Sequence, residues 1–124
     1  MSAKPSADIP QFEIDCRPAE DVYVVRIAGE VHISHEEELR SELRTAVAAD
    51  ARGMVVDLTE CESIDSSAVR ALLLSREAQH PEEGSERLAV AASSEQILRI
   101  LGVMGIYGVI PIRPTVEEAA ALSG

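Results

Sequence analysis

A nearly continuous apolar run from Met54 to Leu58 is the feature that most limits how this chain can fold. A short run of this kind is typical of a central strand that is covered on at least one face. Apolar residues at helical spacing lie on both sides of it, from Leu39 to Val47 and from Val69 to Leu73. A buried strand between two amphipathic helices predicts a mainly parallel sheet covered by helices.

The segment before the first helix predicts two strands. Residues from Tyr23 to Ile27 alternate between apolar and other positions and are followed by Gly29, which is the pattern of a half-buried strand that ends at a turn. Phe12 to Asp15 is a candidate for a shorter partner strand.

The C-terminal third predicts two more strands and two more helices. Leu88 to Ala92 and Val109 to Ile112 have strand composition, and Pro111 places the second of them at a sheet edge because proline lacks an N–H group. Ser94 to Leu101 predicts a helix, and Thr115 is a suitable cap for a last one. The expected order is β-β-α-β-α-β-α-β-α, an α/β fold with a mixed, mainly parallel sheet and about four helices.

Capping and turn residues suggest where the first two helices begin and end. Ser34 is a plausible N-cap of the first helix and Gly53 its end, with Glu36 and Arg40 forming an i,i+4 ion pair. The second helix is expected to start at Ser66 and to stop at Pro81 to Gly84.

The length of 124 residues predicts one domain. The first ten residues lack the charged start and apolar run of a signal peptide, so we expect a flexible tail over residues 1–10 and a single domain over residues 11–124. No apolar stretch is long enough for a membrane span, which predicts a cytoplasmic protein without membrane insertion.

The charge of the chain limits the class of partner. It has 22 acidic and 11 basic side chains, a net charge of −11, and only 2% aromatic residues. Such a surface repels phosphate backbones and anionic lipid and offers few rings for base stacking, so nucleic acid is not an expected partner. A cationic or mixed-charge protein surface is expected instead, and the oligomeric state is left open.

Cysteine and histidine residues predict no cofactor and no metal. Cys16 and Cys61 are the only cysteines, form no CxxC pair and are expected to be reduced and semi-buried. His32 and His35 lack a third ligand in the sequence. We expect them to be solvated loop side chains, with a partner contact by His32 as the second possibility.

The segment from Val55 to Leu73 carries the functional signal, because it delivers Asp65, Ser66 and Ser67 to the start of a helix. The first helical turn has unpaired N–H groups and a partial positive charge, which favour an anion. A phosphate on a serine there adds roughly 1.5 to 2 negative charges. The alternative is that Ser66 or Ser67 only caps the helix, assisted by the charge of Asp65.

This segment resembles the signature of STAS domains, specifically of bacterial anti-sigma-factor antagonists, in which an apolar strand and Asp-Leu are followed by Asp-Ser-Ser-Gly-Leu. The resemblance extends from Phe12 onward. Gly29-Glu30-Val31 is similar to the family's Gly-Glu-Leu-Asp turn, and Leu98 to Ile106 to its Leu-x-Gly-Leu segment.

The resemblance implies a protein-binding switch without catalytic residues. It implies that Ser66 is the phosphorylated serine, that the partner is an anti-sigma factor with serine-kinase activity, and that a serine phosphatase reverses the modification. The antagonist frees a sigma factor when it binds. The chain departs from the family pattern at Ala68, where glycine is usual, and at His32, where aspartate is usual; the added methyl of Ala68 lies where a partner backbone would approach.

The two loops at the carboxyl ends of neighbouring parallel strands should form the docking surface, since α/β folds place their sites there. The expected contacts around Ser66 are Glu30, His32, Asp65, Ser67, Ala68 and Arg70.

Three other functions compete with the switch. A STAS protein also serves as a non-switching subunit or regulator of a transporter or a stress-signalling complex, which phosphorylation of the serine would distinguish. A serine nucleophile is disfavoured, because the motif is Asp-Ser-Ser-Ala rather than Gly-x-Ser-x-Gly and no histidine base is evident. The sequence neither supports nor excludes a small ligand at the strand ends.

Overall fold

The strands and helices of the chain follow the predicted order. The computed structural model describes residues 12–49, 51–78 and 87–122. The elements are β1 (Glu13–Ala19), β2 (Val22–Glu30), the 3₁₀ turn η2 (Ile33–His35), α1 (Glu36–Ala48), β3 (Gly53–Ser63), α2 (Ser66–Ala78), β4 (Leu88–Ala91), α3 (Glu95–Val103), the 3₁₀ turn η3 (Ile106–Gly108), β5 (Ile112–Arg113) and α4 (Val116–Leu122).

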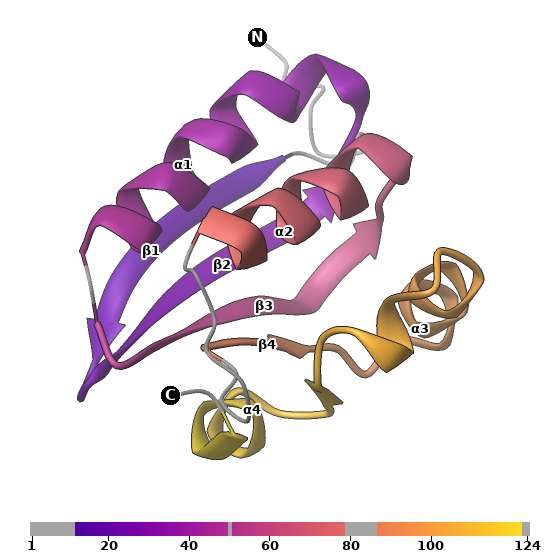
Figure 1. Ribbon diagram of the computed structural model, residues 1–124. Helices are drawn as coiled ribbons and strands as arrows, with labels where there is room; N and C mark the ends of the chain where they lie inside the picture. Colours follow the sequence, from indigo (N-terminus) through magenta and orange to yellow (C-terminus); the bar gives the residue numbers. More distant parts are fainter. Residues whose placement is uncertain (1–11, 50, 79–86, 123–124) are drawn as a thin grey trace, which may run out of the picture.

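The sheet is mixed and has the order β1-β2-β3-β4-β5. β1 is antiparallel to β2, and every later pair is parallel, so β2, β3 and β4 end at one edge of the sheet. Helices α1 and α2 cover one face, where the buried side chains of α3 join the same core, and α4 lies on the other face (Figure 1). The predicted α/β fold class is therefore confirmed.

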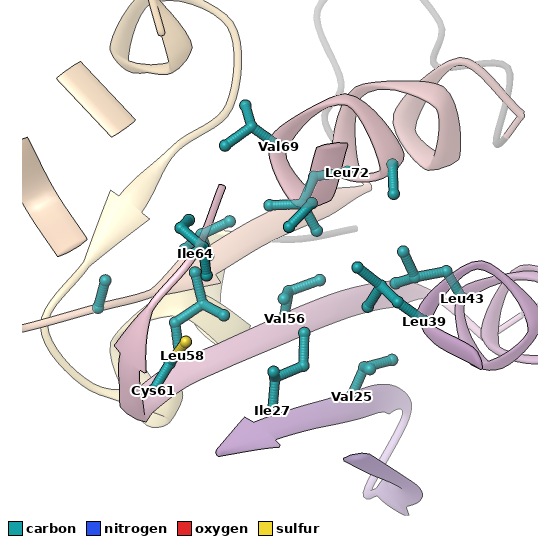
Figure 2. Close-up of a cluster of buried hydrophobic side chains, with 14 of the residues drawn as sticks. Val25, Ile27, Leu39, Leu43, Val56, Leu58, Cys61, Ile64, Val69 and Leu72 are labelled. Atoms are coloured by element: carbon teal, nitrogen blue, oxygen red, sulfur yellow. The ribbon is translucent and has the colours of Figure 1, made fainter. Parts of the chain in front are cut away.

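The main core lies between the sheet and the α1–α2 layer. Val56 and Leu58 of β3 face Leu39 of α1 and Leu72 of α2 (Figure 2), and all four are at most 2% exposed. Leu73, which shares the predicted apolar stripe with Leu72, is only partly buried. Leu39 and Leu72 therefore fulfil the helical pattern, and Leu73 does not.

A second apolar cluster lies on the other face of the sheet. Val22 and Val24 of β2, Val55 of β3 and Ala91 of β4 pack with Ala119 of α4. The expectation that β2 is half-buried is therefore wrong for its first part, since Val24 and Val25 point to opposite faces and both are fully buried.

Several strands differ in length from the prediction. β1 runs to Ala19 rather than to Asp15, and β2 runs to Glu30 rather than to Ile27. β3 continues to Ser63, so that only Ile64 and Asp65 connect it to α2. The last strand is reduced to Ile112–Arg113, at the predicted edge position. Residues before it instead form the turn η3, and Ile110 enters the core at 1% exposure.

The helix boundaries agree with the sequence at three of four starts. α2 begins at Ser66, and the side chains of Ser94 and Thr115 accept hydrogen bonds at the starts of α3 and α4. Ser34 is not the cap of α1, because η2 includes it and His35 occupies the N-cap position. Gly53 does not end α1 either, since it is the first residue of β3.

The ion pair predicted on α1 is present, with Arg40 Nη1 at 3.4 Å from Glu36 Oε2. The predicted tail and the predicted helix stop at Pro81 to Gly84 lie outside the described residues. Within the described part, no helix combines the length and apolarity that a membrane crossing requires.

Candidate docking site at the start of α2

The structure brings together two loops that are more than thirty residues apart, as predicted. Glu30 at the end of β2 pairs with Ser63 at the end of β3, and the Val31 N–H donates to the Ser63 carbonyl at 2.9 Å. Gly29 has φ +86°, a conformation that glycine adopts without strain, and the ladder shifts register beside it. The Glu30–His32 loop therefore lies beside the β3–α2 connection (Figure 1).

Asp65 is the cap of α2, whereas the alternative interpretation of the sequence gave this function to Ser66 or Ser67 with Asp65 assisting through its charge. Its Oδ1 accepts the Ala68 N–H at 3.1 Å and the Ser67 hydroxyl at 2.7 Å. Aspartate is as good an N-cap as serine, so the signal was present in the sequence. The Asp65 carboxylate thus fixes the Ser67 side chain and stabilises the first turn of the helix.

The capping by Asp65 leaves the Ser66 side chain available. Ser66 is the first residue of α2 and is exposed. Its hydroxyl makes no hydrogen bond to any of the residues that the structure describes, so no described histidine or carboxylate activates it as a nucleophile. Arg70, one helical turn later, is also exposed.

Ala68 lies in a different environment from its neighbours. It is 4% exposed and belongs to the main core, together with Ile64 and Val69. The expectation that its methyl group faces an approaching partner is therefore wrong. Of the residues proposed for the docking surface, Ala68 alone has a buried side chain; Glu30, His32, Asp65, Ser66, Ser67 and Arg70 are partly or fully exposed.

His32 and His35 are not equivalent solvated side chains. His32 is exposed, and its Nε2 lies 3.2 Å from Glu30 Oε1. His35 is partly buried and stacks on Phe12 with ring centroids 4.2 Å apart, while its Nδ1 accepts the backbone N–H of His32 at 3.2 Å. The expectation of a solvated side chain is wrong for His35.

The stacking on Phe12 was missed by the sequence interpretation. Phe12 is the only phenylalanine of the chain, but nothing in its neighbourhood indicates a contact with a residue 23 positions later. Through it, the start of the described chain supports the loop that carries His32.

The two cysteines have no electrostatic activation. Burial and a 3.0 Å hydrogen bond to Glu42 raise the pKa of the Cys16 thiol to about 12, and burial raises the pKa of the Cys61 thiol to about 11. Both groups are therefore protonated near neutral pH. No group of three His, Cys, Asp or Glu side chains is placed to hold a metal ion within residues 12–49, 51–78 and 87–122.

Similar structures share this arrangement of strands and helices. An anti-sigma factor antagonist from Mycobacterium paratuberculosis superposes with a TM-score of 0.79 at 22% identity, covering 98% of each chain. The anti-sigma factor antagonist SpoIIAA in its unphosphorylated form has a TM-score of 0.69 at 19% identity, covering 89% of this chain and 93% of that one. SpoIIAA of Bacillus, described as a cell fate determinant, in its phosphorylated form has a TM-score of 0.62 at 20% identity, covering 90% and 97%.

A family model described as "Mlab, STAS domain" matches residues 14–113. The match includes β1 from its second residue, β2 to β5 and the first three helices, with the complete β3–α2 segment. The chain therefore belongs to the STAS domain family.

Proposed function

We propose that this protein is a non-enzymatic anti-sigma-factor antagonist that is switched by phosphorylation of Ser66. Unphosphorylated, it binds an anti-sigma factor with serine-kinase activity and frees a sigma factor. The docking surface consists of Glu30, His32, Asp65, Ser66, Ser67 and Arg70. The single observation that supports this most strongly is the exposed and unengaged hydroxyl of Ser66 at the start of α2.

A phosphate at Ser66 is compatible with the fold. The first-turn N–H groups of a helix and its partial positive charge stabilise an anion there. Asp65 caps the helix through Ala68 and Ser67, so modification of Ser66 breaks no capping hydrogen bond. The modification is therefore expected to leave the free energy of unfolding nearly unchanged.

The same phosphate is expected to weaken binding. It places roughly 1.5 to 2 additional negative charges next to Asp65 in a chain of net charge −11. A partner that covers the site must desolvate this dianion, at a cost that reaches several kcal/mol and hence orders of magnitude in affinity. Dissociation follows phosphorylation, and a serine phosphatase restores the binding form.

The structural relatives support the proposal by analogy. The protein from Mycobacterium paratuberculosis is an anti-sigma factor antagonist, and SpoIIAA has been solved in both an unphosphorylated and a phosphorylated form. A cytoplasmic location, where sigma factors act, belongs to the same proposal.

The test is to incubate the protein with its cognate anti-sigma factor and ATP and to map the phosphate by mass spectrometry. We expect phosphate on Ser66, tight binding by Ser66→Ala without release, and weak binding by Ser66→Asp, which should melt close to wild type. Ser67→Ala is the matched control and should still be phosphorylated. Phosphate on Ser67 alone, or equal binding by Ser66→Ala and Ser66→Asp, contradicts the proposal.

A second function is a non-switching STAS subunit or regulator of a transporter or stress-signalling complex. It is supported by the matched family model, which is that of the Mlab STAS domain and not of an antagonist. A chain that binds its partner equally well with Ser66 and with Asp at this position, and that no kinase modifies, would have this second function.

A further inference from the structure

A groove between α1 and α2 lies apart from the docking surface. It has a volume of about 490 Å³ and is lined mainly by Arg40, Arg44 and Val47 of α1 and by Ala71, Leu74 and Ala78 of α2. The small alanine side chains of α2 leave the groove open, and Leu74 is 50% exposed beside them. The groove residues of α2 begin more than one turn after Ser66, so its occupant need not touch the proposed phosphorylation site.

The two arginines of the groove differ in their availability. Arg40 is engaged by Glu36 at 3.4 Å on the same helix. Arg44, one turn further, is exposed and forms no ion pair or hydrogen bond with the side chains that the structure describes. The chain carries twice as many acidic as basic side chains, so most basic groups can pair within the protein. Arg44 lies at an apolar groove and has no ion-pair partner among the described side chains, which makes it complementary to an external anion.

We propose that this groove binds a single-chain carboxylate amphiphile such as a fatty acid. The carboxylate lies on Arg44, whose guanidinium suits a carboxylate in a bidentate geometry. The alkyl chain lies along Val47, Leu74 and Ala78. From Ala71 to Ala78 the helix rises about 10 Å, and the cavity falls within the roughly 300 to 1,000 Å³ of ordinary small-molecule sites.

The charge and the volume of the groove favour a carboxylate amphiphile over a phosphate dianion and over a helix of another protein. Arg40 is already paired with Glu36, so of the two groove arginines only Arg44 has no ion-pair partner among the described residues, which matches a monoanion rather than a phosphate dianion. An amphipathic helix of another protein is the competing occupant, but a volume of about 490 Å³ is that of an ordinary small-molecule site. The inference does not depend on the proposed antagonist function.

The test uses decanoate as the probe and the purified, ¹⁵N-labelled chain. Titration followed by ¹H–¹⁵N correlation spectra should give saturable shifts in residues 44–48 and 71–78. Arg44→Gln should weaken binding about tenfold or more, because it removes a charged hydrogen-bond partner. Arg99→Gln is the matched control, since Arg99 is exposed on α3 and does not line the groove, and it should keep the wild-type affinity.

The apolar half of the groove is tested by a second pair of variants. Leu74→Asn should weaken decanoate binding, whereas Val103→Asn should not, because Val103 is 81% exposed on α3 and does not line the groove. Butanoate, which has the carboxylate but a short chain, should bind at least tenfold more weakly than decanoate.

Three results would overturn the inference: no saturable shift with decanoate, equal binding of butanoate and decanoate, or wild-type affinity in Arg44→Gln. The kinase assay on Ser66 is read separately. Failure of decanoate binding therefore leaves the proposed function intact, and loss of Ser66 phosphorylation does not affect the groove.

Discussion

Asp65 and Ser66 divide two tasks at the start of α2. Asp65 holds the helix end through Ala68 and Ser67, whereas the hydroxyl of Ser66 makes no hydrogen bond within the described part of the fold. A residue that serves as a switch must be free to change chemically without unfolding its surroundings. The position of the cap one residue before Ser66 provides this freedom.

Asp65→Ala should lower the free energy of unfolding by about 1 kcal/mol, the usual cost of a lost N-cap. Ser66→Ala should change it by less than about 0.5 kcal/mol, as expected of an exposed residue without partners. Urea denaturation measures both. An equal loss in the two variants would contradict the assignment of the cap to Asp65 alone.

Arg70 should interact with a phosphate on Ser66, because side chains at i and i+4 of a helix are neighbours and lean toward its N-terminus. In protein carrying phosphoserine at position 66, Arg70→Gln should raise the second pKa of the phosphate, since a nearby cation stabilises the dianion. Titration by ³¹P NMR measures this pKa. Arg99→Gln should leave it unchanged; an equal shift in both variants would exclude a specific contact with Arg70.

At the scale of elements, the β3–α2 unit joins the main core to the docking site. Ile64 and Ala68 are buried next to the exposed Ser66, so the packing of α2 on β3 sets the position of the serine. The loop after β2 is held against this unit by the pairing of Val31 with Ser63.

Leu72→Ala should destabilise the protein by about 2 to 5 kcal/mol, because Leu72 is 2% exposed in the main core. Leu73→Ala is the matched control on the same helix and should cost clearly less, since Leu73 is only partly buried. Chemical denaturation compares the two. A loss below half a kcal/mol in Leu72→Ala would contradict its position in the core.

For the whole molecule, the pKa values of the two thiols predict how stability depends on pH. Their ordinary pKa is 9.0, and folding raises it to about 12 for Cys16 and about 11 for Cys61. The folded chain therefore retains protons that the unfolded chain loses above pH 9. The stabilisation is complete below pH 9 and declines as the pH rises toward 11 and 12.

Denaturation between pH 7 and 11 should show this decline, and Cys16→Ser should make it less steep, because serine does not titrate in this range. Ellman's reagent provides a second measurement at pH 8, where both thiols should react slowly in the native protein and quickly after unfolding. An identical pH profile for Cys16→Ser and wild type would mean that the Cys16 thiol is not protected by folding.

Local patterns in the sequence were enough for the order of strands and helices and for the starts of α2, α3 and α4. Helical periodicity, capping residues and short apolar runs each report on a few neighbouring residues, and here they agree with the tertiary contacts. Ser66 was singled out by the resemblance to the STAS signature, because a strand, a loop and a helix start by themselves fit a capping serine equally well.

Only the tertiary structure decided which strand and helix faces are covered by residues that are distant in the sequence. Val24 is buried because α4, more than ninety residues later, covers the far face of the sheet, and no pattern around Val24 reports that. The orientation of Ala68 toward the core and the stacking of His35 on Phe12 likewise depend on distant residues. The shortness of β5 results from Ile110 entering the core, a packing gain that strand propensity alone does not include.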